Sequence, residues 1–141
     1  MLDLILKNGK FYVDDHFENV CVGVKNGKIT TISEEAYMPQ AKEVLDLEGQ
    51  YVIPGTIDTH VHVRDPGHTE RGNFYTETLA AAAGGVTTIM EHPISVPPQY
   101  NVEILENRIE CAQKQCVVDY CFYGAAGAEY ADEITRLAAD G

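Results

Sequence analysis

Two histidines separated by one residue, His60 and His62, have the residue type and spacing that suit metal chemistry. In a β-strand successive side chains point to opposite faces, so these two imidazoles would share one face. Neutral imidazoles on one face can converge on a divalent ion at about 2.0 to 2.1 Å. The pair therefore predicts a metal site, with surface or core histidines as the alternative. Asp58 shares that face and either orients a ligand or bonds to nearby backbone.

The segments that would position this pair alternate between strand-like and helix-like after Pro54, which is the pattern of repeated β/α units around a parallel sheet. The predicted segments are strand 56–63, helix 74–83, strand 86–90, helix 102–115, strand 117–123 and helix 130–139. The two histidines then lie near the carboxyl end of the first strand, where β/α barrel enzymes carry their active sites. The sequence therefore predicts an α/β fold that contains the first three units of a (β/α)8 barrel.

Residues 1–53 are rich in β-forming side chains and are predicted to form a small, mainly antiparallel sheet module. The tetrapeptide KNGK occurs at residues 7–10 and again at 25–28, and its Asn-Gly pair favours a hairpin turn. We place a domain boundary before Pro54, which gives domains 1–53 and 54–141. A complete barrel needs about 250 residues, so a barrel fragment is favoured over a compact three-stranded domain.

Composition limits the classes of partner and compartment. Apolar residues make up 45% and charged residues 23% of the 141 residues, as in a soluble globular protein. A net charge of −12 with only 10 Lys and Arg argues against nucleic acid and anionic membranes as partners. The sequence has no apolar run of about 18 residues and no signal-like start, so a cytoplasmic location is expected. The four cysteines form no CxxC pair and are expected to be reduced.

Three segments of the sequence resemble the cyclic amidohydrolases, specifically the branch with dihydroorotases, allantoinases and hydantoinases. They are VLDLEGQYVIPG at residues 44–55, PGTIDTHVHVRDPG at 54–67 and FYTETLAAAAGGVTTIMEHP at 74–93. The resemblance covers nearly the whole chain. It implies a β/α barrel with a β-sandwich assembled from both chain ends, so residues 1–53 would be only part of the sandwich.

The resemblance also implies a metal-dependent hydrolysis of a cyclic amide or ureide. His60 and His62 match the first two metal ligands of a site that usually holds two zinc ions, although manganese or another divalent ion is an alternative. A carboxylated lysine, two further histidines and a catalytic aspartate would follow residue 141. No catalytic residue is therefore expected within this chain, which should be inactive alone. Complete relatives commonly form homo-oligomers.

The residues give mixed indications about the substrate. Arg64 matches the arginine with which dihydroorotases bind the substrate carboxylate, although a surface pair with Asp65 is the alternative. Dihydroorotases usually carry Met-Pro-Asn after the second strand, whereas this sequence has Ile94 in place of the asparagine. Allantoinase-like and dihydroorotase-like activities are both kept, followed by a hydantoinase or dihydropyrimidinase type. A non-catalytic scaffold and a stand-alone binding domain are further alternatives. His92, which precedes a proline, is expected to be structural.

Overall fold

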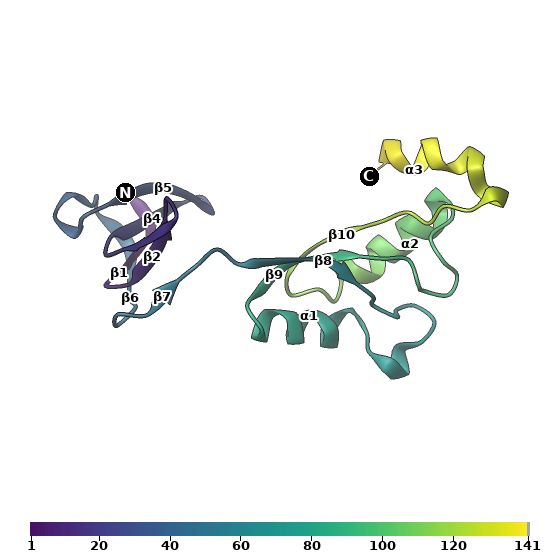
Figure 1. Cartoon of the computed structure of the whole chain (residues 1–141), viewed down its shortest axis with the longest axis horizontal. Coiled ribbons are helices and arrows are strands. Elements are labelled where there is room, and N and C mark those ends of the chain that lie inside the picture. The colour runs from purple at the N-terminus through teal and green to yellow at the C-terminus, as the bar shows by residue number, and fades with distance from the viewer. Residues whose placement is uncertain (141) are drawn as a thin grey trace. The chain divides into compact units, whose positions relative to one another are not determined.

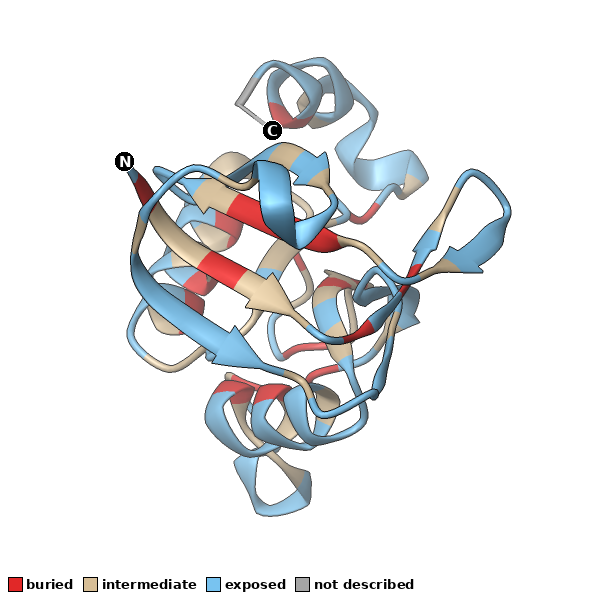
Figure 2. Cartoon of the chain, turned by 90° about the vertical axis from the view of Figure 1, so that its left-hand side faces the viewer, coloured by how far each residue is buried: buried red, intermediate tan, exposed pale blue. Residues whose placement is uncertain are grey.

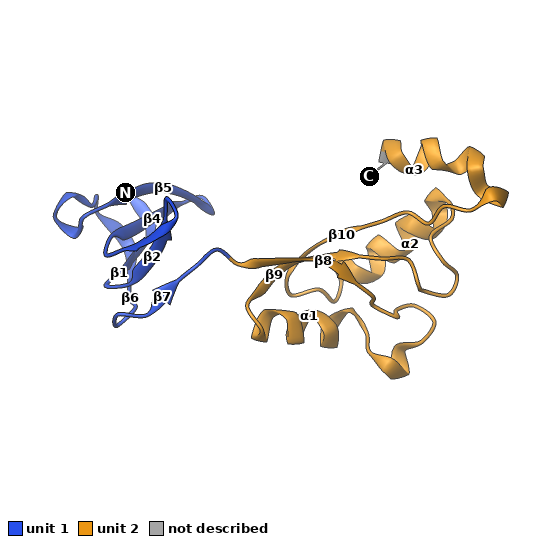
Figure 3. Ribbon diagram, viewed as in Figure 1, with its two compact units in different colours: residues 1–54 blue, residues 55–141 orange. Residues whose placement is uncertain are grey.

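The computed structural model describes residues 1–140 and divides into two compact units, Met1–Pro54 and the residues from Gly55 onward (Figures 1 and 3). The first unit contains two β-sheets, and the second contains a parallel sheet with α-helices. The chain is therefore an α/β protein. The division falls beside the boundary expected from the sequence. No helix within residues 1–140 is long and apolar enough to cross a membrane.

The first unit has a four-stranded sheet in the order β5-β4-β1-β6 and a three-stranded sheet in the order β3-β2-β7. Its elements are β1 Leu2–Lys7, β2 Lys10–Val13, β3 His16–Glu18, β4 Cys21–Lys25, β5 Lys28–Ser33, the 3-10 turn η1 Glu35–Tyr37, β6 Ala41–Asp46 and β7 Tyr51–Val52. Strand β1 is antiparallel to β4 but parallel to β6, and β2 is antiparallel to β3 but parallel to β7. Three of the five strand pairs are antiparallel, which agrees with the expected mainly antiparallel module, and the pairs made by β6 and β7 are the parallel exceptions.

The two parallel pairs have one cause, which is that the chain passes twice from the larger sheet to the smaller one. It crosses first between β1 and β2, and again between β6 and β7. Backbone hydrogen bonds join the two crossings, because the Leu47 N–H donates to the Lys7 carbonyl at 2.9 Å and the Lys10 N–H donates to the Gln50 carbonyl at 2.8 Å. Each sheet therefore gains one parallel pair from the same double crossing.

The two KNGK tetrapeptides adopt different structures. In the second, Asn26 and Gly27 have φ angles of 50° and 72° and join β4 to β5 as a tight hairpin. The first does not form the expected hairpin, because β1 and β2 belong to different sheets. A Cβ on Gly9 would lie 2.8 Å from Leu47 Cδ1, so any larger residue there would displace the Leu47 side chain. The same four residues therefore form a turn in one place and a crossing in the other.

The second unit is built on a parallel sheet in the order β10-β9-β8. Its elements are β8 Thr56–Val61, the 3-10 turn η2 Thr69–Arg71, α1 Phe74–Ala83, β9 Val86–Glu91, α2 Val102–Gln113, β10 Asp119–Phe122, the 3-10 segment η3 Ala128–Glu133 and α3 Ile134–Asp140. A buried core joins Val63, Phe74, Ile89 and Ala112 (buried residues are red in Figure 2). Helices α1 and α2 therefore cover the same face of this sheet.

Local signals explain the helix ends. Helix α1 has the predicted bounds, since the Asn73 side chain accepts from the Thr76 N–H at 2.9 Å in a capping box. Asn101 caps α2 in the same way by accepting from the Ile104 N–H at 2.9 Å. Gly85, with φ of 83°, supplies the left-handed residue after α1. The first and third strands of the sheet are shorter than predicted, ending at Val61 and beginning at Asp119.

The four cysteines of the described chain are all free. Cys21 is buried in the first unit, and the other three lie partly buried in the second. Burial raises the pKa of Cys116 to about 11, so its thiol is protonated near neutral pH. These cysteines are packing residues in this structure.

Candidate metal and substrate site

His60 and His62 lie side by side at the end of β8, as the alternation of strand side chains requires. His60 belongs to the strand and His62 follows its last residue by one position. Their ring centroids are 5.1 Å apart, and both side chains are exposed. Two imidazoles that bind one tetrahedral ion at about 2.0 to 2.1 Å have ring centroids about 5 Å apart. The separation of this pair therefore fits two ligands of one metal ion.

His92 lies immediately after β9 and joins this pair. Its ring stacks on His60 with a centroid distance of 4.0 Å and an interplanar angle of 15°, and its centroid is 5.8 Å from that of His62. Its other neighbour is Tyr123, just past β10, at 4.4 Å. The expected structural role agrees with the 3.3 Å separation of His92 Nε2 from the Thr59 carbonyl oxygen, while the place of the ring beside the histidine pair follows from the order of the parallel strands. The carboxyl ends of neighbouring parallel strands meet at one edge of the sheet, so the residues following them become neighbours.

The three imidazoles do not form a complete metal site. The His60 and His92 rings are nearly parallel, so their in-plane nitrogen lone pairs do not converge on one point. Within residues 1–140, no group of three or more His, Cys, Asp or Glu side chains is arranged to hold a metal ion. The geometry of His60 and His62 suits two ligands of one ion, and the ring of His92 does not add a third. Asp58 takes the backbone role expected as one alternative, because its carboxylate accepts from the His60 N–H at 3.1 Å.

Arg64 and Asp65 point to different surroundings, which removes the surface ion pair considered from the sequence. Asp65 is buried, and its carboxylate accepts from the Phe74 N–H at 3.4 Å and from Gln115 Nε2 at 3.0 Å. The Arg64 side chain is partly buried and has no hydrogen bond or ion pair within the described residues 1–140. Its guanidinium is therefore available for an anionic group.

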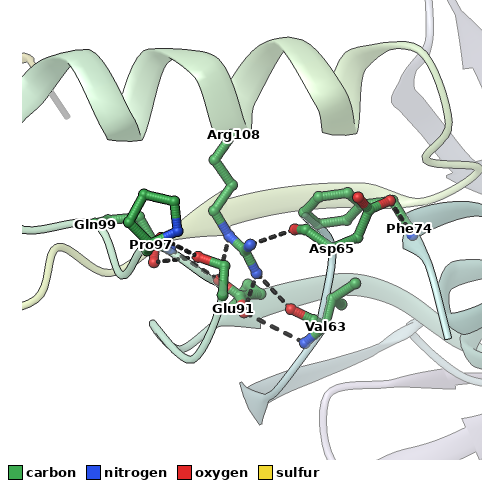
Figure 4. A network of polar contacts seen from close by, with 8 residues as sticks. Val63, Asp65, Phe74, Glu91, Pro97, Gln99 and Arg108 are labelled. Atoms are coloured by element: carbon green, nitrogen blue, oxygen red, sulfur yellow. Dashed lines mark hydrogen bonds and ion pairs between the residues drawn. The ribbon is translucent and has the colours of Figure 1, made fainter. Parts of the chain in front are cut away.

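A buried ion pair between Glu91 and Arg108 lies directly behind these residues (Figure 4). Arg108 Nη2 is 2.5 Å from Glu91 Oε1, and Arg108 Nε is 3.1 Å from Glu91 Oε2. The side chains are 1% and 0% exposed, respectively, for Arg108 and Glu91. Gln99 also donates to Glu91 Oε2, at 3.1 Å. Burial raises the pKa of Glu91, while the hydrogen bonds and charge of Arg108 oppose that rise.

Sequence reasoning missed this ion pair. Glu91 ends a strand and Arg108 lies on a helix, and each position taken alone is typical of a solvated charge. The available signal was periodicity, because Glu91 shares the face of β9 that carries the buried Ile89. A charged residue on the buried face of a strand requires a partner.

Comparison with known proteins identifies what this arrangement is similar to. The sequence profile of the family described as "Dihydro-orotase-like" matches residues 49–140. A dihydroorotase of Methanosarcina acetivorans is 36% identical over 97% of this chain and 30% of its own length. An allantoinase of Desulfitobacterium hafniense is 38% identical over 96% of this chain and 30% of its own length. A solved L-hydantoinase (dihydropyrimidinase) from Arthrobacter aurescens is 32% identical with a TM-score of 0.93, covering 100% of this chain and 32% of that one.

Proposed function

Because the chain belongs to the dihydro-orotase-like family, we propose that the protein it represents is a metal-dependent hydrolase of a cyclic amide or ureide. The chain spans about 30% of the length of the curated relatives it matches. We assign it to the N-terminal part of such an enzyme, with part of a β-sandwich in residues 1–53 and the first three units of a (β/α)8 barrel in residues 54–141. The observation that carries this proposal is the His60 and His62 pair at the end of the first parallel strand.

In this proposal His60 and His62 hold one zinc ion of a binuclear site, with the remaining ligands supplied by later strands. When bound, zinc polarises a carbonyl and lowers the pKa of a water molecule. The chain's own contribution is to present two neutral imidazoles in a fixed arrangement. The Asp58 carboxylate holds the backbone of His60, and the stacked ring of His92 restricts the rotation of the His60 side chain.

Arg64 is proposed to bind an anionic substituent of the ring substrate. A guanidinium forms two parallel hydrogen bonds with a carboxylate, and this one is free of partners within residues 1–140. That favours a carboxylate-bearing ring such as dihydroorotate. Ile94 has no side-chain donor for the same carboxylate, which favours an allantoin-like ureide.

A hydantoinase or dihydropyrimidinase activity is the second candidate. It is favoured by the TM-score of 0.93 with the L-hydantoinase structure. In addition, an apolar side chain such as Ile94 suits a ring substrate without a carboxylate. We also propose that the complete protein is cytoplasmic, for which the four free thiols are the supporting observation, and that it is a homo-oligomer, as its resemblance to the family implies.

The experiment uses the complete protein, meaning the full reading frame that contains this chain. Purified protein loaded with zinc is assayed with dihydroorotate, allantoin and hydantoin. We expect hydrolysis of one of these rings, and loss of at least about 100-fold in kcat/KM for His60→Ala and His62→Ala, since each removes a metal ligand. His16→Ala, an exposed histidine of the first unit, is the matched control and should leave activity unchanged.

Two outcomes would contradict the proposal. One is a complete, zinc-loaded protein that hydrolyses none of the three rings, which would favour the non-catalytic scaffold. The other is normal activity in both histidine variants. The isolated 141-residue protein is expected to show no measurable hydrolysis, because a partial ligand set and no catalytic aspartate are present. Robust turnover by this protein alone would contradict the assignment of the remaining ligands to later strands.

A further inference from the structure

We propose that Arg108 and Glu91 are positioning residues that fix the main chain on both sides of Arg64 and thereby aim its side chain at the site. The positioning itself follows from the contacts of the two residues. Its consequence for substrate binding rests on the proposed function.

The first observation is that Arg108 holds the two carbonyl groups that flank Arg64. Its Nη2 donates to the Val63 carbonyl at 2.5 Å, and its Nη1 donates to the Asp65 carbonyl (Figure 4). Because both flanking carbonyls are bound by one planar guanidinium, the two peptide groups keep a fixed separation and orientation. Arg64 and Asp65 lie between these two peptide groups, so the short segment of main chain that carries Arg64 is held at both ends by a residue from α2.

The second observation is that Glu91 completes this restraint. Its Oε1 accepts from the Val63 N–H at 3.3 Å, so both polar backbone groups of Val63 are bound to the same ion pair. Val63 directly follows His62, and its side chain is fully buried in the core of the second unit. The pair therefore fixes the segment that leaves the histidine pair as well as the segment that carries Arg64.

The third observation is that the same ion pair fixes the loop after β9. Gln99 Nε2 donates to Glu91 Oε2 at 3.1 Å, and Ser95 Oγ donates to Gln99 Oε1 at 3.2 Å. Ser95 and Gln99 are both buried. The loop that they hold contains Ile94 and begins with His92, so the loops after β8 and β9 are held by one network.

A purely structural role would not need this geometry. Apolar side chains of similar volume can hold a helix against a sheet equally well, because packing of a core is not directional. What the charged pair adds is a set of directed hydrogen bonds, and those made to backbone outside the pair end on the residues around Arg64. A double substitution by apolar side chains can therefore separate the packing role of the pair from its role in positioning the backbone around Arg64.

The test replaces both charges with apolar side chains in the double variant Glu91→Leu/Arg108→Met. This variant leaves no buried unpaired charge, so it is expected to fold, which the far-ultraviolet circular dichroism spectrum and the melting temperature will show. The control is Glu110→Leu/Lys114→Met, which removes an exposed ion pair of 3.9 Å at the end of α2.

The first readout is the rate of tryptic cleavage after Arg64, relative to cleavage after the exposed Arg71, in the complete protein, with the peptides identified by mass spectrometry. We expect the relative rate to rise at least about tenfold in the double variant, because local opening of the segment no longer breaks bonds to Arg108. Arg108→Lys should give an intermediate rate, since an ammonium group cannot bind both carbonyls and Glu91 as a fork does. If the folded double variant is cleaved after Arg64 as slowly as the wild-type protein, the proposal is overturned.

The second readout uses the complete protein and compares a ring substrate that carries a carboxylate with one that does not. We expect KM to rise about tenfold or more for the first in the double variant, while KM for the second changes little, because a small displacement of a binding group weakens only the interactions it makes. Equal changes for both substrates would contradict the role of Arg64. If the wild-type protein hydrolyses no ring, the proposed function fails, and the cleavage readout still decides the positioning role.

Discussion

The two units of the chain use the same kind of ion pair in opposite surroundings. In the first unit, Lys42 Nζ lies 2.6 Å from Asp3 Oδ1, and both side chains are well exposed to solvent. In the second, Arg108 Nη2 lies 2.5 Å from Glu91 Oε1 with almost no exposure. Solvent screens the first pair, so it contributes little to stability. The second pair cannot lose one partner without leaving a buried charge.

This difference shows which interactions hold each unit in its fold. The fold of the first unit depends on turn conformations and on the double crossing between its sheets. Its polar side chains lie mainly at the surface. The second unit has a polar network inside its core, next to the segments that carry the candidate site. Distance between charged atoms is nearly the same in the two pairs, so burial and the neighbouring hydrogen bonds determine their importance.

The comparison between the two ion pairs is tested first by removing one buried charge, for which we expect the largest change in stability. Arg108→Met alone leaves the Glu91 carboxylate buried without its cation, and should lower the free energy of unfolding by about 3 to 5 kcal/mol. Urea unfolding followed by the helical circular dichroism signal measures this, since the α-helices all lie in the second unit of residues 1–140. The additional change Glu91→Leu should recover a large part of the loss. A loss below about 1 kcal/mol for the single variant would mean that the pair behaves like a surface pair.

The next largest effect is expected for the alkylation rate of Cys116, whose thiol is partly buried. Burial raises the pKa of Cys116 to about 11 from an ordinary value of 9.0, so the thiolate fraction at pH 8 falls about 100-fold. Alkylation of Cys116 by iodoacetamide should therefore be slower by about that factor in the folded protein than in the unfolded protein. A urea concentration of about 8 M unfolds most small proteins and supplies the unfolded reference. Mass spectrometry of the modified peptides gives the two rates. Equal rates would show that the second unit is open around this residue.

A smaller effect is expected at the exposed histidine cluster. His92→Ala removes the ring that stacks on His60 at 4.0 Å and should weaken cobalt or zinc binding by about tenfold, which is the low end for loss of a group that orients a ligand. His92→Phe retains a stacking ring and should bind metal nearly as well as the wild type. Titration calorimetry with the complete protein measures both affinities. If the two variants bind equally weakly, His92 contributes through its nitrogen atoms instead of through stacking.

The smallest effect is expected at the exposed pair of the first unit. A hydrogen bond from Lys42, followed by one from the Asn26 N–H, lowers the pKa of Asp3 from its ordinary 3.8. A lowered pKa stabilises the folded state above pH 3.8, and this contribution is lost as the pH falls through the lower folded value. The amide resonance of Asn26 should follow this titration in nuclear magnetic resonance spectra. Lys42→Ala should move its midpoint upward while barely changing stability at pH 7.

The sequence predicted the second unit well where local signals were sufficient. The predicted helix 74–83 has the bounds of α1, and the alternation of segments indicated a parallel sheet. It predicted the first unit less well. KNGK at residues 7–10 has the same letters as the true hairpin at 25–28, and contacts with the segment around Leu47, far along the chain, distinguish the two. Such a contact is not encoded within the tetrapeptide.

The candidate site was predicted in part for a similar reason. His60 and His62 were found because they are neighbours in the sequence and share a strand face. His92 required the order of the strands, and the Arg108 contacts required the position of α2 over the end of β8. These are properties of tertiary structure, and a single sequence without strand pairing does not specify them.

The double crossing of the first unit has a consequence for the order in which the chain folds. The β4–β5 hairpin pairs residues that are close in sequence, so it can form within microseconds of leaving the ribosome. The pairs of β1 with β6 and of β2 with β7 instead join residues about 40 positions apart. Within this unit, the last strand of the larger sheet ends at Asp46 and the last strand of the smaller sheet ends at Val52, shortly before Gly55 begins the second unit. Translation thus supplies the last strand of one unit just before the first strand of the next.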